Sequence, residues 1–219
     1  MAATKVLGIV SQKGGVGKTT VSMLLADCLH HQGKRVVVVD TDPQKSAQKW
    51  ESKALPEYAP FPVRVDAVSG LSEVEFAQWL ERRATGVDYF IIDTPPNLQS
   101  RELRAALYIA DKVILPFVPH ATSIDALEEV LPLVQAVAQE RGDDIAIRVL
   151  LNKVDWRRSS ERAIVENAAK ICPFPLMKAR LKNLAAYADV ANYRTSLYSL
   201  SVHREAREAL EAVTKEACK

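Results

Sequence analysis

The chain has 219 residues and a formal net charge of +2, with 48% hydrophobic and 26% charged residues. Such a chain buries roughly 70% of its unfolded surface in one core, which excludes a disordered, collagen-like or low-complexity protein. The small charge does not by itself indicate nucleic acid or membrane, and three scattered cysteines argue against a metal cluster within the chain. We expect a single domain over residues 1–219 in a reducing cytoplasm.

Short β-branched runs alternate with helical patterns along the chain. The predicted strands are 6–10, 36–39, 90–92, 113–115 and 145–151. Apolar residues from Val21 to Leu29 repeat at helical spacing, and Gly33 is expected to end that helix. Three prolines predict a loop over 54–62, and Pro132 predicts a kink or a late start in a helix over 124–138. This alternation predicts an α/β protein with a mostly parallel twisted sheet and helices on both faces.

A glycine-rich segment from Gly8 to Thr20 follows the first predicted strand and opens the first helix. A phosphate-binding loop requires that context, because backbone N–H groups and a helix N-terminus surround the anion. Lys18 is placed to reach the β- and γ-phosphates, and Thr19 to bind Mg²⁺ directly. The general loop pattern has a glycine where this chain has Gln12. The predicted nucleotide contacts in the loop are Lys13, Gly14, Gly15, Val16, Gly17, Lys18, Thr19 and Thr20.

The sequence Lys-Gly-Gly-Val-Gly-Lys-Thr, from Lys13 to Thr19, resembles the deviant phosphate loop of the ParA/MinD family of ATPases. The likeness covers nearly the whole chain and is closest to the short, single-domain ParA partition ATPases. It implies a Rossmann-like P-loop NTPase fold that binds ATP and Mg²⁺. In that family the first lysine contacts the partner's nucleotide in a sandwich dimer. The resemblance therefore gives Lys13, beside Lys18, a catalytic role.

Three aspartates follow apolar runs, at the strand ends where α/β sheets bind ligands. Asp40 and Asp42 lie in the sequence Asp-Thr-Asp-Pro-Gln, and Asp93 ends the sequence Tyr-Phe-Ile-Ile-Asp. By resemblance, Asp40 and Asp93 hold Mg²⁺ through water, and Asp42 is catalytic because it orients the attacking water. Phosphoryl transfer needs little beyond such placement and charge neutralisation. An Asx-type turn is the alternative explanation of Asp42.

The sequence Asn-Lys-Val-Asp, from Asn152 to Asp155, ends a later strand. Taken alone, it suggests guanine recognition, with the carboxylate reading the base. The resemblance instead makes Asn152 a contact of adenine, so ATP is expected and GTP is the alternative. Residues 178–189 resemble the family segment that closes over the base.

Positive charge is concentrated between Arg148 and Lys182, where nine basic and three acidic residues leave a local excess of six. Such an excess predicts phosphate binding, and non-specific DNA binding needs only a basic face of this kind. The alternative is a solvated helix face. The candidate DNA contacts are Arg157, Arg158, Arg180 and Lys182.

The resemblance implies a nucleoid-associated ATPase that segregates plasmid, chromosome or protein cargo. ATP is expected to form a homodimer that binds DNA non-specifically, and a ParB-like or other cargo adaptor to stimulate slow hydrolysis and release. The alternatives are a MinD-like membrane-surface regulator and a metabolic ATP-dependent enzyme on the same fold. The C-terminal stretch from Ala206 to Ala217 argues against membrane binding, because its alanine stripe and glutamates suit docking on the protein body.

Overall fold

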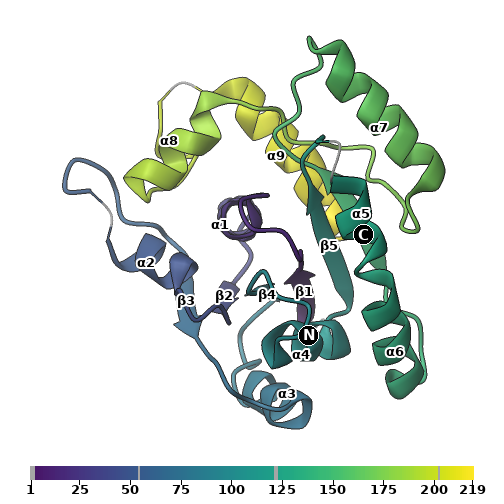
Figure 1. The fold of residues 1–219 in the computed structure, drawn as a ribbon. Helices are drawn as coiled ribbons and strands as arrows, with labels where there is room; N and C mark the ends of the chain where they lie inside the picture. The colour runs from purple at the N-terminus through teal and green to yellow at the C-terminus, as the bar shows by residue number, and fades with distance from the viewer. Residues whose placement is uncertain (1–2, 54, 121–122, 202) are drawn as a thin grey trace.

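A computed structural model describes residues 3–53, 55–120, 123–201 and 203–219. Its centre is a six-stranded sheet in the order β3-β2-β4-β1-β5-β6 (Figure 1). Every pairing of these strands is parallel, so the predicted parallel α/β fold is confirmed. The strands are β1 (Lys5–Ile9), β2 (Val36–Asp40), β3 (Arg64–Ala67), β4 (Tyr89–Asp93), β5 (Lys112–Phe117) and β6 (Ile147–Leu151).

Helices cover both faces of the sheet. One face packs against α1, α2, α8 and α9, and the other against α3, α4, α5, α6 and α7 (Figure 1). The helices are α1 (Lys18–His31), α2 (Ser46–Ser52), α3 (Glu73–Glu81), α4 (Arg101–Ile109), α5 (Ser123–Glu128), α6 (Leu131–Arg141), α7 (Ser159–Ile171), α8 (Ala185–Tyr193) and α9 (Arg204–Ala217).

Strand β2 is a run of valines in which apolar and polar residues do not alternate. Val38 joins the core formed with α1 and α9, whereas Val37 and Val39 join the opposite core, with Phe76 of α3. Successive side chains of a strand point to opposite faces, and both faces of this sheet are covered. A central strand of a parallel sheet is therefore apolar throughout.

The sequence analysis does not predict β3, which pairs only with β2 and forms one edge of the sheet. It has four residues, and the guanidinium of Arg64 pairs with the carboxylate of Asp66 on the same strand. Val65 is the one residue of this four-residue strand that is buried. Its sequence therefore lacks the continuous apolar run that marks the other strands.

Prolines determine two other boundaries. Pro132 is the second residue of α6, where its missing N–H is not needed. The predicted helix over 124–138 is instead two helices, because α5 ends at Glu128 and α6 begins at Leu131, one residue before Pro132; the expected irregularity is a break rather than a kink or a late start. Residues 55–62 of the predicted loop contain no helix or strand, and residue 54 lies outside the described residues.

The C-terminal helix α9 docks on the body, as predicted. Leu210 and Val213 are buried in the same core as Leu25 of α1, and α9 lies alongside α1. Within the described ranges, no helix combines the length and the hydropathy needed to cross a membrane.

Candidate nucleotide-binding site

The glycine loop connects β1 to α1 at the end of the sheet where ligands bind in α/β folds. Gly15 and Gly17 have φ angles of 78° and 90°, which L side chains rarely adopt. A Cβ at Gly15 would meet no atom within 4 Å, whereas a Cβ at Gly17 would lie 2.7 Å from Nδ2 of Asn152. Gly17 is thus required by its backbone angle and by the closeness of Asn152.

A cavity of about 350 Å³ opens beside this loop. Lys18 lines it with a side chain that is only 8% exposed, and Nζ lies 3.5 Å from the carbonyl oxygen of Lys13. Burial lowers the pKa of Lys18, and the charges of Asp93 and Asp42 oppose that shift. A bound phosphate would supply the negative charge that this buried ammonium needs. The lining residues are Gly14, Gly15, Gly17, Lys18, Thr19, Thr20, Asp42, Ser46, Pro96 and Lys153.

Asp93 ends β4 with a fully buried carboxylate. It accepts hydrogen bonds from Oγ1 of Thr19 at 2.7 Å and from Oγ of Ser22 at 3.0 Å. Burial raises the pKa of Asp93 to about 7, and the Thr19 hydrogen bond acts in the opposite direction. The sequence analysis paired Thr19 with Mg²⁺ but missed Ser22. The only feature of the sequence that indicates a role for Ser22 is its position three residues after Thr19, which places both residues on the same face of the helix.

Asp40, at the end of β2, accepts hydrogen bonds from two backbone N–H groups. Oδ1 accepts from Asp42 at 3.1 Å, and Oδ2 from Gln48 at 2.9 Å. Burial raises the pKa of Asp40, and the N–H of Gln48 opposes that shift. Asp42 forms the Asx-type turn that the sequence allowed, since Oδ1 accepts from the N–H of Gln44 at 2.8 Å. Asp42 also lines the cavity, so the turn holds its carboxylate beside the phosphate loop.

The oxygen donors at and behind the wall of this cavity fit Mg²⁺. Thr19 lines the cavity with a hydroxyl, and Asp93 lies buried behind it, in hydrogen-bond contact with that hydroxyl. Asp40 is buried at the end of the neighbouring strand, and hard oxygen donors of this kind are the ones that Mg²⁺ prefers, directly or through water. The described residues contain no group of three or more His, Cys, Asp and Glu side chains that could hold a metal ion alone. Mg²⁺ sites of nucleotide-binding proteins have few protein ligands, because waters and the phosphates of the nucleotide supply the others.

A second cavity of about 260 Å³ adjoins the first, because Thr20 and Lys153 line both. Asn152 lines it too, and Nδ2 donates to the carbonyl oxygen of Val16 at 2.8 Å. Helix α8 supplies Tyr187, so residues 178–189 do lie beside the phosphate loop. The other lining residues are Leu24, Lys182, Asn183, Leu184, Ala188, Ala191 and Asn192. The arrangement offers a charged compartment for phosphates and a more apolar one for a base.

Lys153 is a site residue that sequence reasoning missed, because it was counted only in the basic excess. Its backbone has φ 55°, and Nζ donates to the carbonyl oxygen of Gly15 at 3.2 Å. This ammonium therefore lies on the phosphate loop, between the two cavities. No local pattern distinguishes it from the neighbouring basic residues, since the contact joins residues 138 positions apart.

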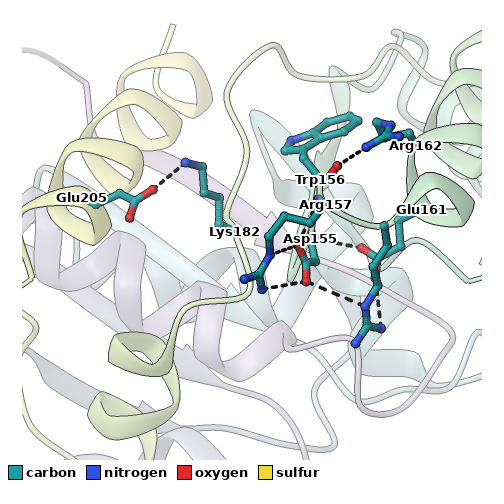
Figure 2. Close-up of polar contacts among 8 residues, drawn as sticks. Asp155, Trp156, Arg157, Glu161, Arg162, Lys182 and Glu205 are labelled. Carbon is teal, nitrogen blue, oxygen red and sulfur yellow. Dashed lines mark hydrogen bonds and ion pairs between the residues drawn. The ribbon is translucent and has the colours of Figure 1, made fainter.

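Of the candidate DNA contacts, Lys182 lines the second cavity, and the other three line neither cavity. Figure 2 shows Lys182 and Arg157 with the carboxylates that they contact. Arg157 and Arg158 follow β6 and precede α7, and both pair with Asp155. The guanidinium of Arg180 lies 4.5 Å from the ring centroid of Trp156, which brings residues 180 and 155–158 together. Lys182 pairs with Glu205 of α9. The structure thus gathers the four candidates around one surface, which we call the basic surface.

The parallel sheet, the glycine loop after β1 and the aspartates that end β2 and β4 define a P-loop NTPase-like protein. A family model described as the CobQ/CobB/MinD/ParA nucleotide binding domain matches residues 7–196. The chain therefore belongs to this family, which confirms the resemblance to ParA and MinD.

Relatives and solved structures agree with that assignment. The chain is 31% identical over 201 residues to the sporulation initiation inhibitor protein Soj of Bacillus subtilis, covering 76% of this chain and 79% of that one. It is 31% identical over 213 residues to the maintenance of carboxysome distribution protein A of Gloeobacter kilaueensis, covering 94% and 88%. A Cyanothece McdA–ATP complex has the same fold, with a TM-score of 0.81 at 19% identity over 100% and 97% of the chains.

Proposed function

We propose that this protein is a Mg²⁺-dependent ATPase that positions plasmid, chromosome or protein cargo. In this proposal, ATP forms a homodimer that binds DNA non-specifically at the nucleoid. A ParB-like or other adaptor on the cargo then stimulates hydrolysis and releases the dimer. The name of one relative, the maintenance of carboxysome distribution protein A, supports a positioning role.

The observation that carries the ATPase activity is the phosphate cavity. Lys18 brings a buried cation to it, Thr19 joins the loop to the carboxylate of Asp93, and the turn at Asp42 holds a second carboxylate at its wall. Lys18 would neutralise the β- and γ-phosphates, and Asp42 would orient the attacking water. A bound Mg²⁺ ion supplies further neutralisation of the phosphate charge.

The dimer is supported by the position of Lys13. Lys18 lines the phosphate cavity of its own chain, but Lys13 does not appear among the described residues around that cavity. Lys13 is the first lysine of the Lys-Gly-Gly-Val-Gly-Lys-Thr motif, the position that in the ParA/MinD family contacts the nucleotide of a second copy.

Adenine, rather than guanine, is supported by the position of Asp155. Nε and Nη2 of Arg157 each donate to this carboxylate at 2.9 Å, and Asp155 is not among the described residues that line the second cavity. A carboxylate that reads guanine would have to face the base. Asn152 does line the cavity and is the proposed base contact.

Binding to DNA rather than to a membrane is supported by helix α9 and by the basic surface. The apolar stripe of α9 is buried against the body, so this helix has no apolar face left for a bilayer. Arginine side chains, by contrast, are exposed on the basic surface, and guanidinium groups suit phosphate binding.

The test measures fluorescence anisotropy of a labelled, random-sequence DNA duplex at near-physiological salt, with ATP and then with ADP. Light scattering on the same samples gives the oligomeric state. We expect an ATP-dependent dimer that binds DNA, and no binding by Lys18→Ala, which loses the phosphate contact. Equal binding in both nucleotide states, or none in either, would refute the proposed cycle.

A further inference from the structure

We propose that the protein's own carboxylates hold the basic surface in a state of low affinity for DNA. We call Asp155, Glu161 and Glu205 the carboxylate latch. This inference rests on the proposed DNA binding and adds its regulation: a DNA phosphate must replace a carboxylate at each latched cation. The latch pairs with three of the four candidate contacts, Arg157, Arg158 and Lys182.

Asp155 is the centre of the latch (Figure 2). It binds the guanidinium of Arg157 through both oxygens and also accepts from the backbone N–H of Arg157 at 3.1 Å. Nε of Arg158 lies 3.8 Å from Oδ2 of the same carboxylate. These hydrogen bonds from Arg157 lower the pKa of Asp155 to about 2, so the carboxylate stays charged at any pH at which the protein would bind DNA.

Glu161, in the first turn of α7, holds Asp155 and Arg158 together. Oε2 accepts from the backbone N–H of Asp155 at 2.8 Å, and Oε1 lies 3.5 Å from Nη1 of Arg158. Two carboxylates therefore face two guanidinium groups, and the four charges cancel. On the other side of the surface, Glu205 of α9 lies 2.5 Å from Nζ of Lys182.

The carboxylates of the latch are less free to move than the arginines with which they pair. The side chains of Asp155 and Glu161 are only 16% and 12% exposed, whereas those of Arg157 and Arg158 are 90% and 66% exposed. The carboxylates are fixed by backbone N–H groups beneath the arginines. The guanidinium groups can therefore turn to a phosphate without the carboxylates following them, which is the geometry that an exchange of partners requires.

Two other arginines, Arg180 of the basic surface and Arg162 of the neighbouring helix α7, have no carboxylate partner among the described residues. Nη1 of Arg162 donates to the carbonyl oxygen of Trp156 at 2.6 Å, and Arg180 stacks over the ring of that residue. Their charges remain available to DNA. Because each cation that neutralises a phosphate contributes about 0.9 to the salt dependence of the affinity, the latch should lower both the affinity and its dependence on salt.

The latch also lies on the segment that touches the nucleotide site. Asn152 and Lys153 donate to carbonyl oxygens of the phosphate loop, and Asp155 follows two residues later. The N–H of Val154 donates to Leu181 at 3.1 Å and its carbonyl accepts from Asn183 at 3.1 Å, on either side of Lys182. A shift of the phosphate loop would therefore reach both halves of the latch.

The test compares Asp155→Asn with wild type by anisotropy on the same duplex with ATP, over a series of salt concentrations. Asparagine keeps an acceptor for the N–H of Arg157 but loses the charge. We expect about two- to fivefold tighter binding, the range set by releasing an exposed ion pair, and a salt slope steeper by about one cation. Glu166→Gln is the matched control, because Glu166 lies exposed on α7 and loses the same charge. A single cooperative thermal unfolding transition and an unchanged ATP affinity verify that the variant is folded.

A double-mutant cycle separates the latch from a general charge effect. In an Arg157→Ala background, Asp155→Asn should lose most of its effect, whereas Glu166→Gln should act equally in both backgrounds. An Asp155→Asn gain that is independent of Arg157, or no larger than that of Glu166→Gln, would overturn the latch and leave DNA binding intact. Tighter binding by Asp155→Asn when wild type binds weakly or not at all would support it. No DNA binding by either protein would overturn the proposed function as well.

Discussion

Replacing a carboxylate of the proposed Mg²⁺ site should stabilise the nucleotide-free protein. Asp93 is fully buried, and the nearby Asp40 carboxylate and the burial itself both disfavour its charge. Asp93→Asn removes that charge but keeps a polar group facing the hydroxyls of Thr19 and Ser22. Those hydroxyls can each donate or accept, so both hydrogen bonds can be kept.

The pKa of Asp93 sets the size of this effect. A folded pKa of about 7, against 3.8 for an ordinary aspartate, corresponds to about 4 kcal/mol at pH 8. The folded state binds more protons than the unfolded state between these pH values. The free energy of unfolding should therefore fall as the pH rises from about 4 through 7, by roughly 4 kcal/mol from this group.

Urea unfolding without nucleotide, at pH 5 and at pH 8, measures the effect. Asp93→Asn should lack most of the pH-dependent loss and be more stable than wild type at pH 8. Saturating Mg²⁺ and ATP should then stabilise wild type far more than the variant, because only wild type has the carboxylate.

Asp88 provides a control of opposite sign. Arg35 lowers the pKa of Asp88 to about 2, so its ionised form stabilises the fold above the ordinary pKa, and Asp88→Asn should be destabilising at pH 8. The reasoning about Asp93 would be refuted if Asp93→Asn were less stable than wild type at pH 8. It would also fail if wild type and Asp93→Asn lost the same stability between the two pH values.

Three other substitutions test the remaining site residues. Lys13→Gln should leave ATP binding to the monomer within about threefold but abolish ATP-driven dimers in light scattering, since the proposed role of this lysine is to contact the partner's nucleotide; a dimer of normal affinity would contradict that role. Asp42→Ala should bind ATP and remain dimeric while hydrolysis falls by about 100-fold, as for loss of a water-positioning group, and a normal rate of phosphate release would exclude that function. Lys153→Met should weaken ATP and ADP equally, by about tenfold in calorimetry, because its ammonium lies at the Gly15 end of the phosphate loop; an effect on ATP alone would place it at the γ-phosphate instead.

Local sequence patterns were sufficient for most of the fold. The valines of β2 and the apolar residues of β4 form continuous runs because both faces of the sheet are covered, and such runs are visible without a structure. The edge strand β3 is short and carries Arg64 and Asp66, so it has no such run. Pro132 indicated a boundary because its ring restricts the chain locally.

The site residues could be predicted where each one belongs to a local motif, as Asp40 and Asp93 do at their strand ends. The loop from Lys13 to Thr20 is one continuous motif, so its pattern could be found directly. Ser22 and Lys153 act on partners 71 and 138 positions away, and no local pattern contains those pairs. Counting charges likewise found the basic surface but could not show that Arg157 is already paired with Asp155.

The tryptophans give the protein a built-in optical reporter. The chain contains three. Trp50 is buried in α2. Trp79 of α3 lies beneath the guanidinium of Arg83, and Trp156 lies beneath that of Arg180 in the basic surface. With phenylalanine at the first two positions, all indole emission would come from the ring under Arg180. The arrival and departure of DNA could then be timed on an unlabelled protein in a stopped-flow instrument.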